Sequence, residues 1–381
     1  MRKNANHVLF ISRWYPSDTD AMLGLFVKNH AKAAASAGYK VTVAYASATS
    51  LELKKRLKTT VITDEGVTEV ITYYSVSNSF GFLHQLIAWY KSISTAIKIQ
   101  GRPSLVHAHI LTRVGFLAML VAWRYRINYI VTEHWSRYFK ENLSYKGFFL
   151  KVFTNLVIKN AAMVTVVSNR LYKAMKEQGL SFMPVILPNA IDTSMFHIID
   201  KDAGNFRFIS ITCFEEKSKN LKTIIDSTGE LQNAGLDFEL IMVGNGTDKQ
   251  MIEKYAADKN VRVNFTGTLS PAETAIQLKS SNCLLLTSNY ETFGIVAYEA
   301  LASGVPVIST DVADLKEVVD VQSGIILSEN SQPSLTMAMR NMLTQHSKYD
   351  PQHLRKRVIE TCSISSISNQ LRTIYQDVIG N

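Results

Sequence analysis

The chain is poor in cysteine, with three among 381 residues. Cys213, Cys283 and Cys362 are widely spaced, and no two of them have the short separation that structural zinc sites use. An odd number of scattered cysteines also argues against a disulfide framework. We therefore expect three reduced thiols, as in a cytosolic protein, and no metal site built on cysteine.

Long apolar runs are absent as well. No stretch reaches the ~18 consecutive apolar residues that predict a transmembrane helix. The first residues, MRKNANHVLFIS, are basic but contain no long apolar segment and no small-residue cleavage motif, so we expect no signal peptide. With 46% hydrophobic and 19% charged residues, the composition is typical of a globular protein with a sizeable core, and we expect a cytoplasmic location.

Several common nucleotide and metal motifs are missing. No Gly-x-Gly-x-x-Gly follows the first expected strand, which argues against a dinucleotide oxidoreductase. There is no P-loop, nucleophile elbow or zinc-binding helix. No Asp-x-Asp stands at a strand end, so we expect neither a divalent metal holding a diphosphate nor any other cofactor. Gly244-Asn245-Gly246 is only a weak signal, because glycine turns after strands are common.

Acidic residues are scarce in the first half of the chain. Residues 1–190 contain 24 Lys and Arg against 9 Asp and Glu, a net charge of +15, whereas residues 191–381 contain 17 against 23, a net charge of −6. This asymmetry predicts an anionic partner for the first half: a membrane surface, a phosphate-bearing acceptor or a nucleic acid. No nucleic-acid-binding motif accompanies the charge, so we expect no nucleic acid.

What the sequence does contain is a regular alternation of short apolar runs and amphipathic helices, which predicts an α/β fold. At 381 residues the chain is comfortable for two domains. In the first half we expect strands at 7–12, 40–45, 105–110, 128–132 and 163–167, helices at 25–37, 82–99, 113–125 and 147–160, and an apolar alternation at 67–72. In the second half we expect strands at 206–211, 238–243, 261–265, 283–286 and 305–308, with helices at 220–233, 249–257, 293–302 and 367–379.

The densest pattern is residues 281–311, SNCLLLTSNYETFGIVAYEALASGVPVISTD. It predicts a buried strand, a polar turn, a helix ended by Gly304 and a second buried strand. Such a βαβ unit almost always crosses over right-handed. Ligands of open α/β sheets bind at the carboxyl ends of the strands, which is where the polar residues of this stretch lie.

Two glutamates, Glu291 and Glu299, frame the start of that helix. The backbone N–H groups of Phe293, Gly294 and Ile295 have no partner inside the helix and attract an anion, which Gly294 lets come close. A carboxylate such as Glu299 can accept two hydrogen bonds from the vicinal hydroxyls of a ribose. The residue types alone favour the plainer interpretation, in which Glu291 caps the helix and Glu299 makes a surface ion pair.

Glu-x7-Glu followed by Ala-x-x-x-Gly-Val-Pro-Val-Ile resembles the nucleotide-sugar motif of the retaining family 4 glycosyltransferases, also described as glycosyl transferases group 1. The resemblance implies the GT-B fold: two Rossmann-like, doubly wound parallel-sheet domains that face a central cleft, with a C-terminal helix crossing back to the first. It also implies that Glu299 holds the ribose hydroxyls, that Glu291 lies against the donor sugar, and that the amides of Phe293–Ile295 receive the diphosphate.

The first half carries looser matches to the same family. Gly24 at a helix start is similar to a family glycine that lets the donor phosphates or the acceptor approach, although an ordinary turn glycine is an equally open interpretation. His134 follows a strand, where the family has a histidine that contacts the donor sugar or its phosphate; a hydrogen-bonded structural histidine is the alternative. His109 is a weaker candidate that could pack in the core. Residues 188–192, PNAID, resemble the family's hinge segment.

One departure from the family lies after the first strand of the second domain. The family holds the diphosphate there with a Gly-Arg pair and a lysine several residues on. Here Thr212-Cys213 replaces Gly-Arg, Asn220 stands where glycine is usual, and Lys219 falls at the lysine position. Lys219 with the helix amides could suffice, or Lys217 could substitute for the arginine; a cation before a helix suits a departing phosphate.

Together these features predict a retaining hexosyltransferase that moves a sugar from a UDP- or GDP-linked donor to a saccharide or polyprenyl-diphosphate-linked acceptor, in bacterial surface-polysaccharide or glycolipid synthesis. The expected catalytic residues are His134, Lys219 and Glu291, and the expected domains are 1–188 for the acceptor, 189–362 for the donor and 363–381 for the returning helix. The basic first domain is expected to dock peripherally on an anionic membrane. The alternatives are a GT-B sugar-nucleotide epimerase, which is a poorer match, and a non-catalytic saccharide-binding subunit.

Overall fold

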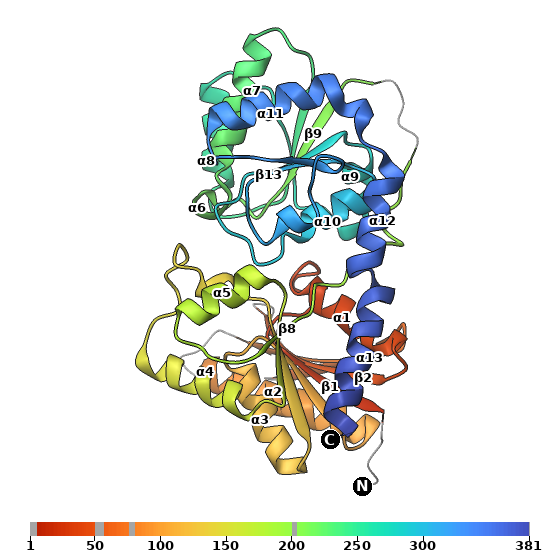
Figure 1. The fold of residues 1–381 in the computed structure, drawn as a ribbon. Coiled ribbons are helices and arrows are strands. Elements are labelled where there is room, and N and C mark those ends of the chain that lie inside the picture. Colours follow the sequence, from red (N-terminus) through yellow and green to blue (C-terminus); the bar gives the residue numbers. More distant parts are fainter. Residues whose placement is uncertain (1–5, 50–56, 76–80, 200–203, 381) are drawn as a thin grey trace. The chain divides into compact units, whose positions relative to one another are not determined.

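A computed structural model describes residues 6–49, 57–75, 81–199 and 204–380, and the side chains of the helix that begins at Gly81 from Leu83 onward. The chain divides into two compact units (Figure 1). The first comprises residues 1–190 together with 364–381, and the second comprises residues 191–363.

In its described part, the first unit has one sheet with the strand order β3-β4-β2-β1-β5-β6-β7-β8. Its strands are β1 (His7–Ser12), β2 (Lys40–Thr49), β3 (Leu57–Asp64), β4 (Val67–Ser75), β5 (Leu105–His109), β6 (Asn128–Glu133), β7 (Met163–Val166) and β8 (Pro184–Ile186). The strands from β4 to β8 in this order pair in parallel, as the sequence predicts.

The edge strand β3 is the exception, because it pairs antiparallel with β4 from Leu57 opposite Tyr74 to Asp64 opposite Val67. The sequence analysis did not predict β3. Most of its residues are exposed or only partly buried, so it lacks the apolar run of a buried strand. Glu65 and Gly66, both with positive φ, make the tight turn between the two strands.

Helices cover both faces of the first sheet. They are α1 (Leu25–Ser36), α2 (Gly81–Gln100), α3 (Val114–Tyr125), α4 (Phe148–Asn160), α5 (Asn169–Glu177) and the C-terminal α13 (Ile364–Gly380). Helix α13 packs along α1 (Figure 1). The hydroxyl oxygen of Tyr375, a residue of α13, lies 2.7 Å from Nδ1 of His107 on β5. The last helix of the chain therefore belongs to the first unit, which is the return that the resemblance implies.

The second unit has a parallel sheet in the order β11-β10-β9-β12-β13-β14. Its strands are β9 (Arg207–Ile211), β10 (Glu239–Val243), β11 (Asn264–Gly267), β12 (Cys283–Leu286), β13 (Val307–Ser309) and β14 (Gly324–Ile326). Its helices are α6 (Glu216–Lys219), α7 (Leu221–Asn233), α8 (Lys249–Asp258), α9 (Pro271–Lys279), α10 (Ile295–Ala302), α11 (Gln332–Gln345) and α12 (Pro351–Cys362). Helix α10 begins two residues later than the sequence predicts, because Gly294 takes a left-handed conformation with φ of 74° as its N-cap.

Each sheet has a point at which the chain reverses its direction of travel across the strands. In the first unit this point lies between β1 and β5, and in the second it lies between β9 and β12. Ligands of open α/β sheets bind outside the carboxyl ends of the strands at such a point. The fold therefore directs attention to the residues that follow these four strands.

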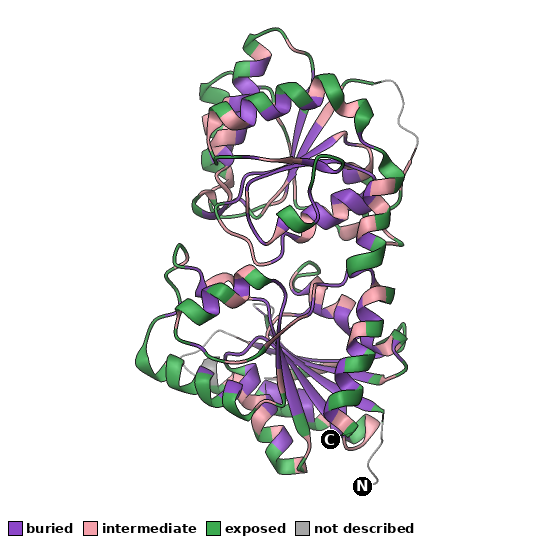
Figure 2. Ribbon diagram, in the orientation of Figure 1, coloured by how far each residue is buried: buried purple, intermediate pink, exposed green. Residues whose placement is uncertain are grey.

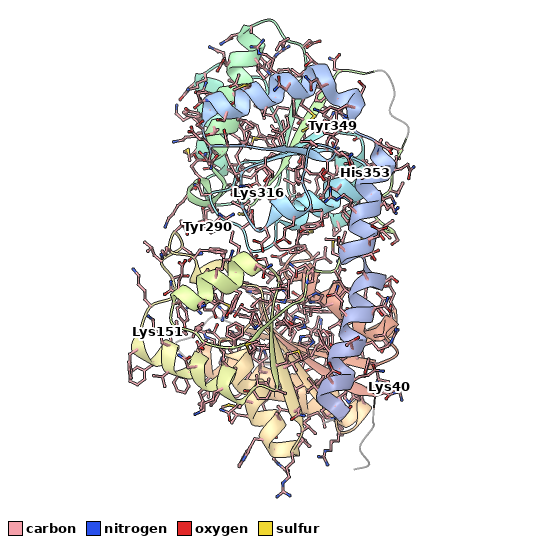
Figure 3. All side chains as sticks on the ribbon, viewed as in Figure 1. Lys40, Lys151, Tyr290, Lys316, Tyr349 and His353 are labelled. Carbon is pink, nitrogen blue, oxygen red and sulfur yellow. The ribbon has the colours of Figure 1, made fainter. Side chains whose placement is uncertain are left out.

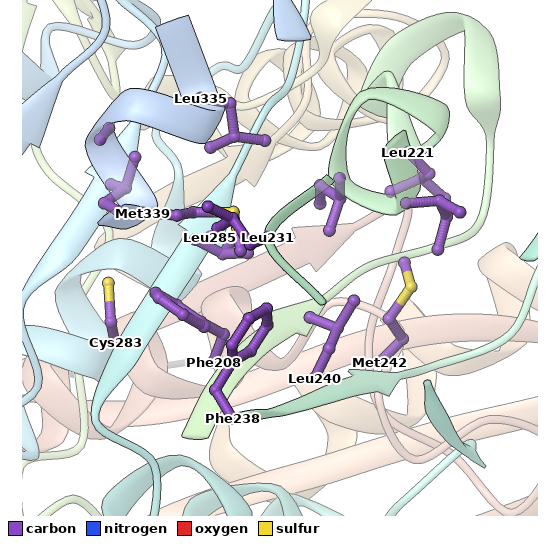
Figure 4. Close-up of a cluster of buried hydrophobic side chains, with 14 of the residues drawn as sticks. Phe208, Leu221, Leu231, Phe238, Leu240, Met242, Cys283, Leu285, Leu335 and Met339 are labelled. Atoms are coloured by element: carbon purple, nitrogen blue, oxygen red, sulfur yellow. The ribbon is translucent and has the colours of Figure 1, made fainter. Parts of the chain in front are cut away.

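Both units have well-packed interiors, with the central strands buried between helices (Figure 2). In the second unit Phe208, Leu240 and Leu285 from the sheet meet Leu231 and Leu335 from the covering helices (Figure 4). Among the described residues, no helix combines the length and the apolar character that crossing a membrane requires.

Candidate active site

The carboxyl ends of β9 and β12 bring together the residues that the sequence singled out in the second unit. The segment after β9 leads into α6, which ends at Lys219, and the loop after β12 carries Glu291. The strands are adjacent and parallel, with Leu284 opposite Ile209. The two polar segments therefore emerge side by side at the point where the strand order reverses.

Hydrogen bonds fix these two segments to each other. The backbone N–H of Asn289 donates to the carbonyl oxygen of Ser218 over 2.8 Å, and its side-chain amide donates to that of Lys217 over 2.9 Å. The hydroxyl of Thr287 donates to the carbonyl oxygen of Lys219 over 2.8 Å. The loop after β12 is thus held against the short helix that positions the lysine ammonium.

Lys219 and Glu291 form an ion pair in which the ammonium donates to Oε1 of the carboxylate. The hydroxyl of Ser288 donates to the same oxygen over 2.8 Å. Burial is the largest single influence and lowers the pKa of Lys219, but the charge and the hydrogen bond of Glu291, together with Cys213 and Tyr290, outweigh it and raise that pKa above its ordinary value. The lysine therefore stays positively charged and can use its remaining N–H donors on a phosphate. Tyr290, labelled in Figure 3, belongs to the same loop.

The N-terminus of α10 presents backbone N–H groups without a side-chain cap. The ring of Phe293 is buried and stacks on that of Tyr298, with centroids 4.3 Å apart and planes 7° apart, which fixes the backbone before the helix. A side chain at Gly294 would be strained by its positive φ. Phe293, Gly294 and Ile295 therefore lie at a helix start suited to binding an anion.

Glu299 lies one helical turn after Ile295 on the same side of α10. Its side chain is partly buried, and the part of the chain that the structure describes gives its carboxylate neither a hydrogen-bond donor nor a cation. Burial raises the pKa of Glu299 to about 8. This rules out the surface ion pair and leaves a carboxylate that a pair of hydroxyl groups would satisfy.

The segment that replaces the family's Gly-Arg pair is packed against the loop after β10. A Cβ on Gly244 would lie 1.9 Å from the carbonyl oxygen of Thr212, and one on Gly246 would lie 1.7 Å from that of Cys213. The two glycines, which were only a weak signal in the sequence, thus permit a close contact between two backbone segments. Lys217 is exposed, so Lys219 is the better-positioned cation of this segment.

His134 is buried in the first unit and makes two hydrogen bonds there. Its Nδ1 lies 3.0 Å from Oδ1 of Asn189, and its Nε2 lies 3.0 Å from Nδ1 of His109. Burial, together with the neighbouring His30, lowers the pKa of His134 well below its ordinary value, so the ring is neutral. Its contacts are those of a structural histidine, and its catalytic role stays a prediction.

His30, His109 and His134 are the residues that could hold a metal ion in the described part of the chain, since one ring nitrogen of each lies within 4.8 Å of the others. Hydrogen bonds to Pro188, to Asn189 and between His109 and His134 engage four of the six ring nitrogens. Nδ1 of His30 and Nε2 of His109 are buried and have no partner.

Gly24 has a positive φ of 73°, and a Cβ there would lie 2.4 Å from the carbonyl carbon and oxygen of Trp14. The glycine therefore lets the start of α1 approach the segment after β1. This contact accounts for the glycine without a ligand, and its predicted donor-binding role stays a prediction.

Sequence reasoning missed a group of arginines in the first unit. Arg13, Arg113 and Arg137 follow the carboxyl ends of β1, β5 and β6 by no more than four residues. The guanidinium groups of Arg13 and Arg137 lie over the ring of Trp135, 4.7 and 4.3 Å from its centroid. Their common position after three neighbouring strands was the available signal.

Comparison with known proteins identifies the two halves of the chain. Residues 23–195 match the family described as Glycosyltransferase Family 4, and residues 193–361 match the family described as Glycosyl transferases group 1. An uncharacterized glycosyltransferase of Methanocaldococcus jannaschii, MJ1178, is 25% identical over 255 residues, which cover 66% of this chain and 68% of that protein.

Solved structures of glycosyltransferases share the fold. Sucrose-phosphate synthase of Thermosynechococcus elongatus matches with a TM-score of 0.77 at 18% identity, covering 98% of this chain and 99% of that one. Alr3699/HepE of Anabaena, solved in complex with UDP-glucose, matches with a TM-score of 0.70 at 16% identity, covering 97% and 99%. The expected GT-B fold is confirmed. The chain joins a Glycosyltransferase Family 4 domain to a glycosyl transferases group 1 domain, and it is a family 4-like glycosyltransferase.

Proposed function

We propose that the protein transfers a sugar from a nucleoside diphosphate, UDP- or GDP-linked, to a saccharide or lipid-linked acceptor with retention of configuration. The observation that carries the proposal is the arrangement around α10. Three groups lie near the strand-order reversal of the second sheet. They are the carboxylate of Glu299, which has no partner among the described residues, the N-terminus of α10, which has no side-chain cap, and the charged ammonium of Lys219. These groups match a ribose, a diphosphate and a leaving phosphate oxygen in the order in which a sugar nucleotide presents them.

Each part of the donor then has a partner. The carboxylate of Glu299 accepts hydrogen bonds from the two ribose hydroxyls. The amides of Phe293, Gly294 and Ile295 bind the diphosphate, assisted by the positive end of the helix dipole. Lys219 adds a cation to the site, and Glu291 holds that lysine in place and lies beside the sugar. The UDP-glucose complex of Alr3699/HepE supports a sugar nucleotide as the donor.

In the proposed reaction the bond between the anomeric carbon and the diphosphate oxygen breaks, and a bond to the acceptor oxygen forms on the same face of the sugar. The proton of the acceptor hydroxyl passes to the departing diphosphate. Lys219 and the amides of α10 stabilise the negative charge that grows on the leaving group, which is the main catalytic contribution expected of such a site. No residue of this site is placed as a nucleophile, in keeping with front-face departure and attack.

We propose further that the acceptor is presented at a membrane in cell-surface polysaccharide or glycolipid synthesis, and that the protein acts on the cytoplasmic face. The support comes from the first unit. Apolar side chains are exposed on α2, α3 and α4, and Tyr90, Trp123, Phe148 and Phe149 are each 74–79% exposed. Lysine and arginine residues stand beside them, among them Lys151 on α4 (Figure 3).

The test of the donor assignment is a screen of UDP-, GDP- and ADP-sugars by thermal stabilisation and by release of nucleoside diphosphate. At a hundred times its Kd, a ligand that binds only the folded chain stabilises it by about 2.7 kcal/mol. We expect one class of nucleotide to stabilise the full chain and to be turned over, and Glu299→Ala, which should bind that donor at least tenfold more weakly, to reduce the stabilisation. A chain that binds no sugar nucleotide would contradict the proposal. Donor binding without turnover with any acceptor would favour the non-catalytic saccharide-binding subunit.

A further inference from the structure

One unexplained feature of the first unit is a cavity of about 550 Å³ at the carboxyl ends of β1, β5 and β6. It lies where the strand order of the first sheet reverses, the position at which open α/β sheets bind ligands. The predicted donor residues all belong to the second unit, except for Gly24 and His134. Neither of these two lines the cavity.

The walls of the cavity are apolar. Helix α2 contributes Leu86 and Trp89, α3 contributes Phe116 and Leu117, and α4 contributes Leu150, Phe153 and Val157. Such a lining accepts hydrocarbon, and its burial is favourable in proportion to the area removed from water. The exposed aromatic side chains Phe148 and Phe149 begin α4, so apolar surface continues from the cavity to the outside of the unit.

One end of the cavity is strongly basic. Arg13, Arg113 and Arg137 all line it, together with Trp135, on which two of the guanidinium groups lie. Within the described residues none of the three arginines forms an ion pair with a carboxylate. The nearby Glu133 offsets only part of their charge, because it is a single carboxylate beside three guanidinium groups. Its oxygens accept hydrogen bonds from the N–H groups of Leu111, His134 and Trp135 and from the hydroxyl of Tyr138, and none from the arginines.

Burial, together with the positive charges of Arg113 and Arg137, lowers the pKa of Arg13 from its ordinary value. The positive charges of Arg113 and Arg137 therefore repel that of Arg13, and the nearby carboxylate of Glu133 offsets only part of this repulsion. Such an arrangement lowers the stability of the fold, and a bound anion would compensate for that loss.

Three N–H donors of the lining residues are also buried without an acceptor. They are Nε of Arg13, Nε of Arg137 and Nε1 of Trp89, whose side chain is 2% exposed. Buried N–H groups are almost always hydrogen-bonded, so each needs an acceptor that the described residues do not supply. A ligand with several acceptor oxygens and more than one negative charge would satisfy both the donors and the cations.

We propose that this cavity binds a lipid diphosphate, with the diphosphate held by Arg13, Arg113 and Arg137 and the start of the hydrocarbon chain held between α2, α3 and α4. A diphosphate fits better than a single phosphate, because three guanidinium groups gather here and each can donate two parallel hydrogen bonds to phosphate oxygens. The inference rests on the proposed function, since it names the anchoring part of the acceptor.

Calorimetric titration of the full chain with farnesyl diphosphate tests the inference. We expect binding that is at least tenfold tighter than that of inorganic pyrophosphate, which lacks the chain, and of farnesol, which lacks the charge. Equal affinity for pyrophosphate and farnesyl diphosphate would leave only an anion site, and binding of farnesol alone would leave only an apolar one. Either result would overturn the lipid diphosphate.

Variants locate the site. Arg113→Gln removes an exposed cation of the cavity. It should weaken the binding of farnesyl diphosphate about tenfold, because charge-assisted hydrogen bonds are lost. Arg137→Gln should do the same, provided that the melting temperature shows a folded chain. The matched control is Arg124→Gln, which removes the same charge from the last turn of α3, outside the cavity lining. We expect this control to bind like the unmodified chain, and an equal loss in it would place the binding elsewhere.

The same titrations separate the inference from the proposed function. The cavity variants should bind the preferred sugar nucleotide with unchanged affinity, because no cavity residue belongs to the predicted diphosphate site in the second unit. Donor binding and turnover without any binding of farnesyl diphosphate would overturn the cavity inference and leave the glycosyltransferase proposal standing. Binding of farnesyl diphosphate by a chain that turns over no sugar nucleotide would contradict the glycosyltransferase proposal and leave the cavity inference standing.

Discussion

The two glutamates of the sequence motif show how neighbouring residues of one type acquire different tasks. Glu291 is committed to Lys219 and Ser288, whereas Glu299, eight positions later, has no partner in the described structure. The difference follows from their positions. Glu291 lies in a loop held against α6, and Glu299 lies on a helix whose neighbouring residues are almost all buried and apolar. A carboxylate of the second kind is ready for a ligand with hydroxyl groups.

The raised pKa of Glu299 makes donor affinity depend on pH. The unliganded carboxyl group has a pKa of about 8, and it can accept a hydrogen bond from both ribose hydroxyls only after it has lost its proton. Binding is therefore coupled to proton loss. We expect the Kd of the preferred sugar nucleotide to fall as the pH rises from about 6 to about 8 and to level off above that. The phosphates of a sugar nucleotide do not titrate in this range.

Two variants check the origin of that dependence by calorimetry at several pH values. Glu299→Gln cannot titrate, so its Kd should be independent of pH. Glu299→Ala should bind at least tenfold more weakly at pH 8, because a hydrogen bond to a charged group contributes about 1.5–3 kcal/mol. A pH profile that survives in Glu299→Gln would assign the titration to another group and remove the ribose role.

Lys219 should affect turnover more than donor affinity, since the charge that it faces grows as the diphosphate departs. Lys219→Gln removes the positive charge but retains a donor for Glu291, so we expect a large loss of kcat with a small change in KM. Lys219→Arg keeps the charge and should recover part of the rate. An unchanged kcat with a raised KM in Lys219→Gln would mean that the lysine only binds the donor.

At the residue level, the sequence predicted which residues lie together where the motif is contiguous; that they bind the donor stays a prediction. Glu291, Gly294 and Glu299 lie within nine positions, and one βαβ unit places them together. The arginine cavity was not predicted, because Arg13 precedes Arg113 and Arg137 by a hundred residues or more and meets them only through the strand order β1-β5-β6. His109 and His134 were named as candidates from the sequence, but their clustering with His30 was not predicted, for the same reason, and a metal ligand set was not expected.

Among the elements, the strands buried on both faces were predicted best. The predicted bounds of β1 and β12 agree with the structure, because a short run of apolar residues bounded by polar ones fits a central parallel strand. Two other strands show the limits of this reading. Strand β11 begins at Asn264, three residues later than predicted, and its residues are exposed or only partly buried. The edge strand β3 was missed altogether.

The start of α1 depends on one glycine. In Gly24→Ala the new methyl group would clash with the backbone of Trp14, and the residue would also hold a positive φ. Gly179, in the same unit, has a φ of 85° but nothing within 4 Å of an added Cβ. We expect Gly179→Ala to lower the free energy of unfolding by about 1–2 kcal/mol, because the alanine must adopt a left-handed conformation. Gly24→Ala should lower it clearly more, because the steric clash is added. Urea denaturation of the two variants measures the difference, and equal losses would contradict it.

The histidines between α1, β5 and β6 should make the first unit sensitive to acid. Burial lowers the pKa of His30 to about 4, and those of His107, His109 and His134 well below the ordinary value. The unfolded chain binds protons on these residues from about pH 6.5 downward, whereas the folded chain does not. Their contribution to stability is therefore complete above pH 6.5 and is lost as the pH falls toward the folded-state values.

The measurement is the free energy of unfolding at several pH values between about 7 and 4, for the unmodified chain and for His30→Gln. The variant cannot take up a proton at this position, so the slope of stability against pH should decrease. His197→Gln is the control, because His197 is an exposed residue of the second unit and its removal should leave the slope as it was. An unchanged slope in His30→Gln would contradict the assignment.

At the scale of the whole molecule, charge and exposed apolar surface coincide in one unit. Residues 1–190 carry a net charge of +15, and residues 364–381 add one Arg and one Asp, so the first unit keeps that value. The largest exposed aromatic side chains, Tyr90, Trp123, Phe148 and Phe149, belong to its helices α2, α3 and α4. The second unit carries an excess of acidic residues. We therefore expect the protein to bind an anionic membrane through the first unit.

Co-sedimentation of the full chain with vesicles tests that expectation. Each basic residue near an anionic leaflet contributes about 1 kcal/mol, and the attraction acts within a Debye length of roughly 8 Å at physiological salt, so binding should weaken as salt is raised. Replacing Phe148 and Phe149 by serine should weaken binding to anionic vesicles without unfolding the chain, because both side chains are 75% exposed. Val321→Ser, which removes an exposed apolar side chain of the second unit, should have no effect. Equal binding to neutral and anionic vesicles, or binding to neither, would contradict the membrane interaction and leave an acceptor in solution as the better explanation of the basic unit.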